Sequence, residues 1–480
     1  MFLIRLLWIV LCLGVLGCFY SSPIRTISLK PNPVLVNWDE RTKEAVQILQ
    51  DLIRIRTERK NEIEVVRYLQ NLLQKEGIPS KIYASKEHPE HANLVAILEP
   101  KKPNSLKGII LGNHSDVVEA DASEWSVPPY SGQIVDGKIY GRGALDMKGL
   151  AVMQLIAFLE LKRSNVELKR KVMFLSLADE ESGSLWGARY MAKEHKRIFE
   201  DYDTMLNEGG VATKDIGIPG STIFNIQYAE KGNLWLKLKA KGQSGHGSAP
   251  TSDYATLNLL RFYEEVLRYD VGVRITEETR AYFYQLGRVA SFPTSFFLKN
   301  ASNPLIKPFL TGTLKKSKHL SAMTSNTKAI TGIESLEGDG YNVLSGETLG
   351  KLDIRVLPGF DTKEYFERIK EIAKPYGVEV EIVDEIGPDD SPLEDELFQI
   401  LANVSVSKIQ GSVAAPFMSS GKTDNARFRR IGIRCYGLNP AILTSKDTET
   451  LHGKDENISI ENLKLGSTIL FETVYQYATP

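Results

Sequence analysis

Seven residues of the types that bind metal ions are spread over five distant segments of this 480-residue chain. They are His114, Asp116, Asp146, Glu180, Glu181, Glu208 and His452. Imidazoles and carboxylates are the ligands that divalent first-row metals take in proteins. If these side chains form one centre, the last segment must return to a site built before position 210. Such a centre therefore demands a discontinuous fold.

Two of the segments come directly after apolar runs that predict buried strands. His114 follows GIILGN, and because side chains two apart on a strand share a face, Asp116 can orient the His114 ring. Glu180 and Glu181 follow KVMFLSLA, where adjacent carboxylates are costly unless a positive charge compensates them. Each pair alone is usually an ordinary loop or surface feature. Together with Asp146 in a glycine-rich turn, they indicate a metal site for hydrolysis.

Apolar patterns along the first half of the chain predict an α/β domain. Helical spacing in AVQILQDLIRI and VVRYLQNLLQ is followed by strands and helices in alternation, ending with YDTMLNEG. Alternation of this kind favours a central mixed sheet covered by helices. Ligand sites in such sheets lie beyond the carboxyl ends of the strands, where the metal motifs fall.

A smaller α+β unit is predicted to interrupt this domain. LWLKLKAKG alternates apolar and polar residues as a half-buried strand does, and strands in LGKLDIRVL and VEVEIVDE flank a helix in TKEYFERIKEIAK. The predicted boundaries are 38–231 and 386–480 for the α/β domain and 232–385 for the inserted unit. An aromatic-rich stretch over 281–310 is interpreted as core or subunit contact, or alternatively as an apolar wall for an acyl chain.

The first 18 residues, MFLIRLLWIVLCLGVLGC, differ from the rest of the chain. One arginine precedes a short apolar run, which is typical of an export signal and short for a membrane span of about 20 residues. Cys18 after Val15-Leu16-Gly17 resembles a lipoprotein cleavage box, and a simply cleaved leader or an anchor are the alternatives. Residues 19–37 are interpreted as a tether. We expect an exported protein, in the cell envelope or secreted.

Charge and length set further limits. Lys and Arg number 59 against 60 Asp and Glu, a balance that argues against a nucleic-acid partner. A chain of 480 residues is long for a single core, so two domains are expected. If Cys18 is lipidated or lost with the leader, Cys435 is the only remaining thiol and no internal disulfide can form.

Seven motifs form a recognisable set: GNHSDVV, WSVPPYSG, DGKIYGRGALDMKG, LADEESGS, NEGG, GQSGHGSAP and LHGKDENIS. The set resembles the aminoacylase, carboxypeptidase S and glutamate carboxypeptidase family of co-catalytic zinc hydrolases. The resemblance runs from about Asn37 to the C-terminus. It is greatest to the branch that holds carboxypeptidase S and the N-fatty-acyl amino acid hydrolase, which has a similar long lid segment. It implies that the inserted unit is a lid and dimerisation domain.

The resemblance also implies two divalent metal ions, expected to be zinc, with Asp146 shared between them. The ligands of one ion are His114, Asp146 and Glu208, and those of the other are Asp146, Glu181 and His452. Glu180 is then the general base, and Asp116 supports His114. A cis peptide bond between Asp146 and Met147 is implied as well.

Three more residues match substrate-contacting positions of the family. His246 matches a lid histidine that polarises the scissile carbonyl, usually in the active site of the partner subunit. Asn342 and Arg355 match residues that hold the substrate carboxylate. The chain departs from the family at Ser345, where proline is usual, and at Asn207, where many members have aspartate.

These residues predict a hydrolase that cleaves an amide bond next to a free carboxylate. The substrate is a peptide that loses its C-terminal residue or an N-acyl amino acid, and the protein acts as a homodimer through the lid. The alternatives are an N-fatty-acyl amino acid hydrolase/synthase and an inactive binding protein of the same fold. An aminopeptidase with a similar dizinc core would need a carboxylate for the free amine, whereas Arg355 and Asn342 favour a substrate carboxylate.

Overall fold

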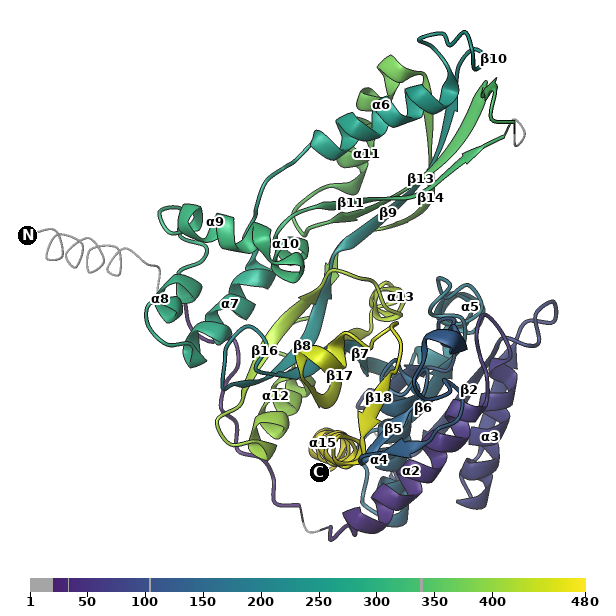
Figure 1. Ribbon diagram of the computed structural model, residues 1–480. Helices are drawn as coiled ribbons and strands as arrows, with labels where there is room; N and C mark the ends of the chain where they lie inside the picture. The colour runs from purple at the N-terminus through teal and green to yellow at the C-terminus, as the bar shows by residue number, and fades with distance from the viewer. Residues whose placement is uncertain (1–19, 33, 103–104, 337–339) are drawn as a thin grey trace, which may run out of the picture.

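The computed structural model describes residues 20–32, 34–102, 105–336 and 340–480 (Figure 1). Its larger domain is built on a nine-stranded sheet in the order β1-β2-β6-β3-β7-β17-β8-β15, with β16 paired to β8. The strands are β1 (Ser80–Ala84), β2 (Ala92–Leu98), β3 (Gly108–His114), β6 (Val172–Leu177), β7 (Tyr202–Lys214), β8 (Thr222–Glu230), β15 (Asp389–Asp390), β16 (Val413–Ser419) and β17 (Arg434–Leu443). β3 is parallel to β6 and β7, whereas β1 and β2 are antiparallel.

Helices cover both faces of this sheet. One face carries α2 (Trp38–Arg54), α3 (Glu62–Lys75), α4 (Lys148–Arg163), α12 (Glu396–Lys408) and α15 (Ile460–Ala478), and the other carries α5 (Ala188–Glu194) and α13 (Asn425–Arg429). α4 is apolar on nearly every side because it lies between the sheet and two other helices, α2 and α15. The predicted α/β fold class is therefore confirmed.

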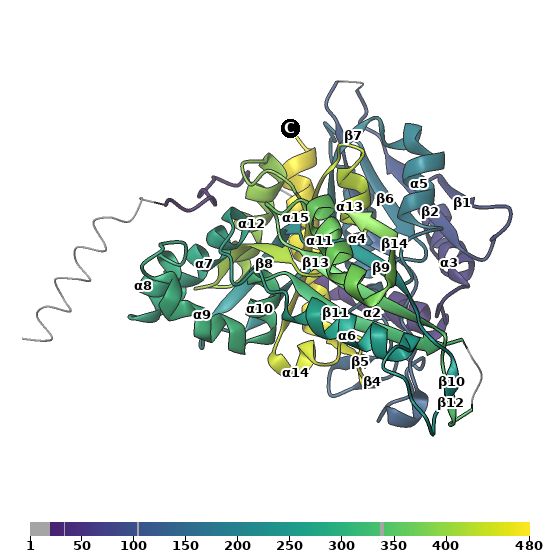
Figure 2. The same ribbon diagram turned by 90° about the horizontal axis from the view of Figure 1, so that it is seen from above.

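The inserted unit, here called the lid after the role that the resemblance implied, contains a four-stranded antiparallel sheet in the order β11-β13-β9-β14. Its elements are β9 (Gly232–Lys241), β10 (Gly245–His246), α6 (Ala255–Arg268), β11 (Thr327–Ser335), β12 (Val343–Leu344), β13 (Glu347–Val356), α11 (Thr362–Ala373) and β14 (Val378–Ile386). α6 and α11 pack on one face through Leu234, Leu236 and Phe262. The other face is turned toward the larger domain (Figures 1 and 2).

Four helices interrupt the lid sequence between α6 and β11. They are α7 (Glu277–Val289), α8 (Thr294–Lys299), α9 (Lys307–Lys316) and α10 (Lys318–Thr324). α7 packs on β16 of the large sheet, where Leu286 joins Ile223 and Val413 in a buried cluster. This part of the chain therefore covers the larger domain rather than filling the lid core.

The segment after the leader lies along the larger domain. The Tyr20 ring packs edge-on against Tyr284 of α7, with 5.1 Å between the centroids. The backbone N–H of Arg25 donates to Gln399 Oε1 at 2.8 Å, and that of Lys30 to Gln476 Oε1 at 2.8 Å. The predicted leader, residues 1–18, lies outside the described residues. Within them, no helix combines the length and apolarity needed to cross a bilayer.

Candidate metal centre

Three neighbouring strands bring four of the predicted ligands to one edge of the large sheet. His114 is the last residue of β3, and Glu208 lies within β7. Glu180 and Glu181 come shortly after the end of β6. Because β3 is parallel to both β6 and β7, the carboxyl ends of these strands meet at the same edge.

Asp146 and His452 reach this edge from other elements. Asp146 lies just before α4, and its peptide bond to Met147 is cis, as the resemblance implied. β18 (Asn457–Ser459) pairs with β5 (Lys138–Tyr140), which returns the C-terminal segment to the loop that carries Asp146. His452 has a φ of 55°, in the left-handed region that residues other than glycine rarely occupy.

Side-chain distances place Asp146 between the two histidines. His114 Nε2 lies 3.2 Å from Asp146 Oδ1 and 3.7 Å from Glu208 Oε1. His452 Nε2 lies 3.0 Å from Asp146 Oδ2 and 3.2 Å from Glu181 Oε1. One carboxylate oxygen of Asp146 thus lies beside each histidine, which is the arrangement expected of a ligand shared by two metal ions. Two overlapping groups of potential ligand atoms result, His114 with Glu180 and Glu208, and His114 with Asp146 and Glu181.

The charges at this edge fit divalent cations. Burial raises the pKa of Glu208 to about 7, and it raises the pKa of Glu180 as well, with Glu208 adding to the effect. Hydrogen bonds to Asp146 and Glu181 raise the pKa of His452 to about 10. Along the described chain, no lysine or arginine forms an ion pair with Glu180, Glu181 or Glu208. Buried carboxylates without such partners are stabilised by bound cations, so this donor set fits two metal ions.

Asp116 connects the strand-end histidine to the glutamate pair. Its backbone oxygen lies 3.0 Å from His114 Nδ1, and its Oδ1 lies 3.3 Å from the same nitrogen. The backbone N–H groups of Glu180 and Glu181 donate to Asp116 Oδ1 and Oδ2 at 3.1 and 2.9 Å. Asp116 therefore orients His114 so that Nε2 faces the centre, the supporting role that metal-bound histidines require.

Glu456 is a supporting residue that the sequence analysis did not identify. Its Oε1 accepts hydrogen bonds from the backbone N–H groups of Leu145 (2.7 Å) and Asp146 (3.0 Å). Its Oε2 accepts from the Gly143 N–H (3.0 Å) and from Arg142 Nη1 (2.8 Å). Arg142 Nη2 in turn donates to the Gly453 carbonyl at 2.9 Å, beside His452. This buried pair thus fixes the backbone on both sides of the centre.

A cavity of about 260 Å³ opens at the metal-binding edge. Asp146, Glu180, Glu208 and His452 line it, together with Lys422. The Lys422 ammonium is drawn away toward the Gly387 carbonyl at 3.3 Å and Asp389 at 3.6 Å. The cavity holds ligand atoms and a half-buried carboxylate, Glu180, that can act as a base. This arrangement defines a metallohydrolase with a two-metal centre.

The predicted substrate residues lie on the lid, at its two ends. His246 and Asn342 meet at the tip, where Asn342 Nδ2 lies 3.3 Å from His246 Nε2, and His246 Nδ1 lies 2.7 Å from Ser248 Oγ. Arg355 lies near the other end of β13, where its guanidinium forms a bidentate ion pair with Asp353 at 2.8 and 3.0 Å. Asn342 precedes β13, and eight residue steps of this strand, about 27 Å, separate Glu347 from Arg355. One chain therefore does not bring Asn342 and Arg355 together.

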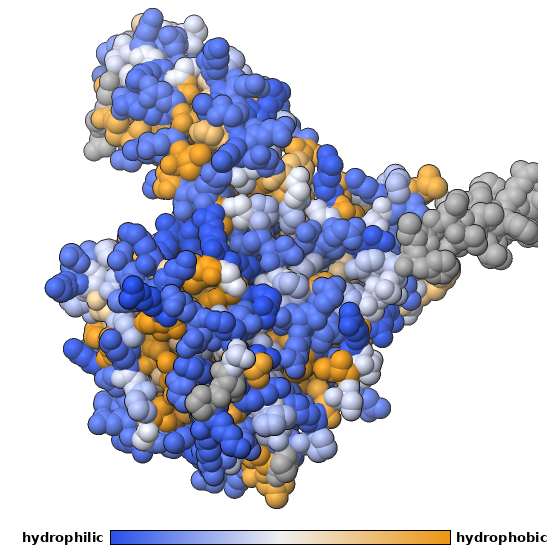
Figure 3. Space-filling view, turned by 180° about the vertical axis from the view of Figure 1, so that it is seen from behind, coloured by the Kyte–Doolittle hydropathy of each residue, from blue (hydrophilic) through white to orange (hydrophobic). Residues whose placement is uncertain are grey.

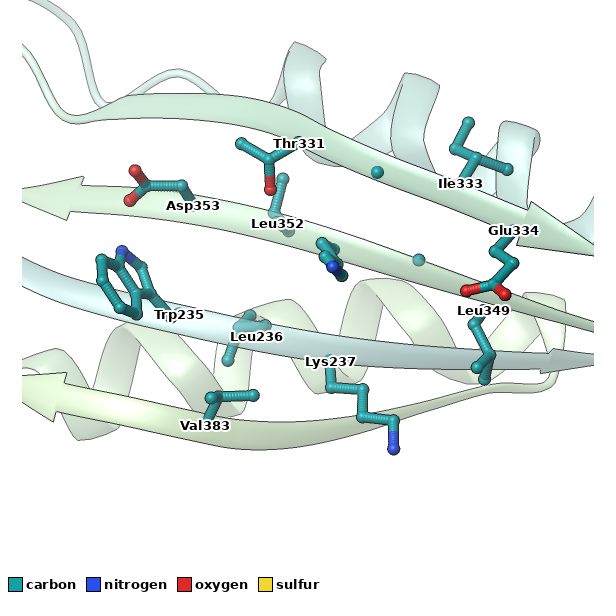
Figure 4. Close-up of a pocket in the computed structure, with 13 residues that line it drawn as sticks. Trp235, Leu236, Lys237, Thr331, Ile333, Glu334, Leu349, Leu352, Asp353 and Val383 are labelled. Carbon is teal, nitrogen blue, oxygen red and sulfur yellow. The ribbon is translucent and has the colours of Figure 1, made fainter. Parts of the chain in front are cut away.

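A second hollow, of about 590 Å³, lies on the open face of the lid sheet (Figure 4). Trp235, Ile333, Leu349 and Val383 line it. The space-filling view shows the lid as a separate lobe with a largely hydrophilic indentation between it and the larger domain (Figure 3). The open face of the lid sheet is thus accessible to solvent.

Comparison with known proteins identifies the family. The model of Peptidase family M20/M25/M40 matches residues 110–476, and the chain belongs to this family. It is 29% identical over 383 residues to the N-fatty-acyl-amino acid synthase/hydrolase PM20D1 of Homo sapiens, covering 77% of this chain and 74% of that protein. It is 27% identical over 367 residues to the probable carboxypeptidase S-like 2 of Dictyostelium discoideum, covering 75% and 70%.

A solved structure of this family shares the fold. An M20 family metallo-carboxypeptidase from Sulfolobus solfataricus superposes with a TM-score of 0.68 at 22% identity, covering 90% of this chain and 99% of that one. The predicted family is therefore confirmed, and with it the metallopeptidase class of this protein.

Proposed function

We propose that this protein hydrolyses an amide bond next to a free carboxylate, using two zinc ions. The substrate is either a peptide that loses its C-terminal residue or an N-acyl amino acid. This proposal rests on a two-metal ligand set that lies beside Glu180, a carboxylate with which no lysine or arginine of the described chain forms an ion pair. A relative named as an N-fatty-acyl-amino acid synthase/hydrolase and another named as carboxypeptidase S-like support both substrate types.

When bound, the two ions would polarise the carbonyl of the substrate and lower the pKa of a bound water molecule. Glu180 takes the proton of the attacking water and passes it to the leaving amine. Burial and the nearby Glu208 raise the pKa of Glu180, a direction that suits a group that must accept and return a proton near neutral pH. Asp116 holds Glu180 in place through the backbone N–H bond described above.

Recognition of the substrate falls to the lid. Arg355 lies on the face of β13 that is turned toward the larger domain, and its planar guanidinium can hold a carboxylate through two parallel hydrogen bonds. His246 and Asn342 lie at the opposite end of the lid sheet from Arg355. A homodimer through the lid accounts for the two positions. In such a dimer, the tip of one subunit's lid can reach the active site of the other subunit, whereas Arg355 of that same lid serves a different active site.

A substrate screen tests this function. Purified protein loaded with zinc is assayed against N-acyl amino acids, dipeptides and the same compounds with the carboxylate amidated. Cleavage of the free acids together with failure on the amides supports the proposal. Turnover of peptides with a free amine and an amidated C-terminus would favour an aminopeptidase, and no turnover with both metals bound would favour a binding protein.

Subunit complementation tests the shared site. Heterodimers of His246→Ala and Glu180→Gln subunits keep one site with an intact base and an intact partner's histidine, so about half of the normal activity should return. Isolated homodimers of each variant should remain inactive. Absence of rescue in purified heterodimers would show that each chain uses its own His246.

The same proposal includes export and a lipid-anchored Cys18, supported by the leader sequence alone. Labelled fatty acid should enter the protein in cells and be lost in the Cys18→Ser variant. A cleaved product without label would show plain secretion instead.

A further inference from the structure

The helical insertion has an unusual charge distribution. Residues 291–324 contain five lysines and no aspartate or glutamate: Lys299, Lys307, Lys315, Lys316 and Lys318. Of these five lysines, all within the described part of the molecule, only Lys315 has an ion-pair partner, Asp270 at 3.2 Å. The chain as a whole carries a formal charge of −1, so this excess of positive charge is local.

The same insertion exposes large apolar side chains. Phe292 is 75% exposed, Phe309 is 73% exposed and Leu305 is 58% exposed. Exposed residues of this size normally need an explanation when they gather in one place. The Phe309 ring lies 6.3 Å from that of Phe297, so the exposed aromatic group continues into the partly buried part of the insertion.

The packing of α9 shows that these exposed residues have no role in the core. Leu310 and Leu314, spaced by four residues, form the inward stripe of the helix and pack in the buried cluster with Phe283, and Ile306 just before the helix is buried as well. Phe309 and Lys316, spaced by seven residues, lie on the outward stripe. The helix therefore has one buried apolar stripe, and Phe309 is an apolar side chain on its outward side that the core does not need.

The insertion also contacts the N-terminal end of the described chain. Tyr20 packs on Tyr284 of α7, and Gln285 Nε2 donates to Ser22 Oγ at 2.6 Å. Cys18, which lies outside the described residues, is two residues before Tyr20 in the sequence. Figure 1 shows α8 and α9 at the end of the molecule beside α7, and Figure 3 shows hydrophobic residues exposed at this edge.

We propose that this surface docks onto a lipid bilayer with anionic headgroups. The surface, here called the insertion surface, consists of Phe292, Lys299, Leu305, Phe309, Lys316 and Lys318. Aromatic and aliphatic side chains enter the interface between headgroups and acyl chains, while lysines around them bind the phosphates. A protein partner of similar shape would need acidic residues, and a second copy of this surface would repel the first through its own lysines.

Hydrogen exchange on the full chain tests the docking. Vesicles of phosphatidylcholine with and without phosphatidylglycerol are added, and exchange is followed by mass spectrometry. Peptides that span Leu305 to Lys318 should exchange more slowly with the anionic vesicles, and the protection should fall at high salt. Peptides of β11 in the lid should be unaffected. The leader is identical in every variant, so its own membrane affinity cancels from the comparison.

Two pairs of variants make the test specific. Phe292→Ser with Phe309→Ser should abolish the protection, whereas Ile333→Ser with Val383→Ser, a pair exposed on the lid sheet, should leave it unchanged. The proposal is overturned if the first pair keeps the protection, or if the same peptides are protected by raised protein concentration without vesicles, which would indicate a second copy.

Charge reversal gives a quantitative check. Each lysine near an anionic surface raises the partition coefficient of the protein onto the membrane about fivefold. The double variant Lys316→Glu and Lys318→Glu should therefore bind anionic vesicles at least about 25-fold more weakly than wild type, relative to neutral vesicles. Lys363→Glu with Lys374→Glu, on the lid, serves as the matched control. Equal losses in both double variants would show a general charge effect and contradict the assigned surface.

Discussion

Replacing Glu456 by glutamine tests how the shared metal ligand is held in place. The carboxylate accepts two hydrogen bonds at each oxygen, from three backbone N–H groups and from Arg142. Glutamine keeps one oxygen and presents an NH₂ group where the other stood, so two donors lose their acceptor in either orientation of the amide. Each unmade bond to a buried group costs about 1–3 kcal/mol. The free energy of unfolding should therefore fall by about 2–6 kcal/mol.

Two assays separate stability from positioning. Urea unfolding of the metal-free protein measures the loss of stability, and calorimetric titration with zinc measures the affinity of both sites. Because Glu456 bonds directly to the Asp146 N–H, the affinity should fall along with the stability. Glu449→Gln, an exposed change in the same segment, should alter neither. Wild-type stability in Glu456→Gln would refute the hydrogen-bond reasoning, and lower stability with unchanged affinity would refute the positioning role.

Three further predictions concern single residues. Glu180→Gln should keep both metals and lose about 100- to 10,000-fold in kcat, measured on the best N-acyl substrate. Normal turnover would show that Glu180 is not the general base. Arg355→Lys should weaken cleavage of free acids by about 1–3 kcal/mol in kcat/KM and leave amidated substrates unaffected; equal losses would make its pairing with Asp353 purely structural. Burial lowers the pKa of Lys231 to about 7, so between that pH and its unfolded value near 10.5 the unfolded state binds one more proton. The stability of wild type relative to Lys231→Met should therefore rise with pH in this window by up to about 1.4 kcal/mol per pH unit, and a flat difference would show that Lys231 stays charged in the fold.

Part of the candidate metal centre could be predicted from local patterns, whereas the ligand roles of Glu208 and His452 were implied only by the family resemblance. GIILGN and KVMFLSLA are continuous apolar runs, which only a buried strand accommodates, and parallel strands bring their ends together. The role of Glu456 could not be predicted in this way, because it stands in a loop next to Asp455 and only tertiary contacts distinguish the two acids. Its burial depends on the pairing of β18 with β5, which no local pattern specifies.

The lid shows a second limit. The strand pattern of LGKLDIRVL predicted β13, but the distance between Asn342 and Arg355 depends on the register of the whole sheet. Likewise, the aromatic content of the insertion gave no sign that α7 packs on β16 rather than in the lid. Such contacts join segments far apart in the chain, and the apolar pattern of a helix shows which face is buried but not against what.

Anomalous scattering from crystals grown with zinc shows whether the protein binds two metal ions that share Asp146. Two peaks about 3.5–4 Å apart are expected, with Asp146 between them. His114 and Glu208 should contact one peak, and Glu181 and His452 the other. A single peak, or two peaks of which only one contacts Asp146, would show that Asp146 is not shared between two ions.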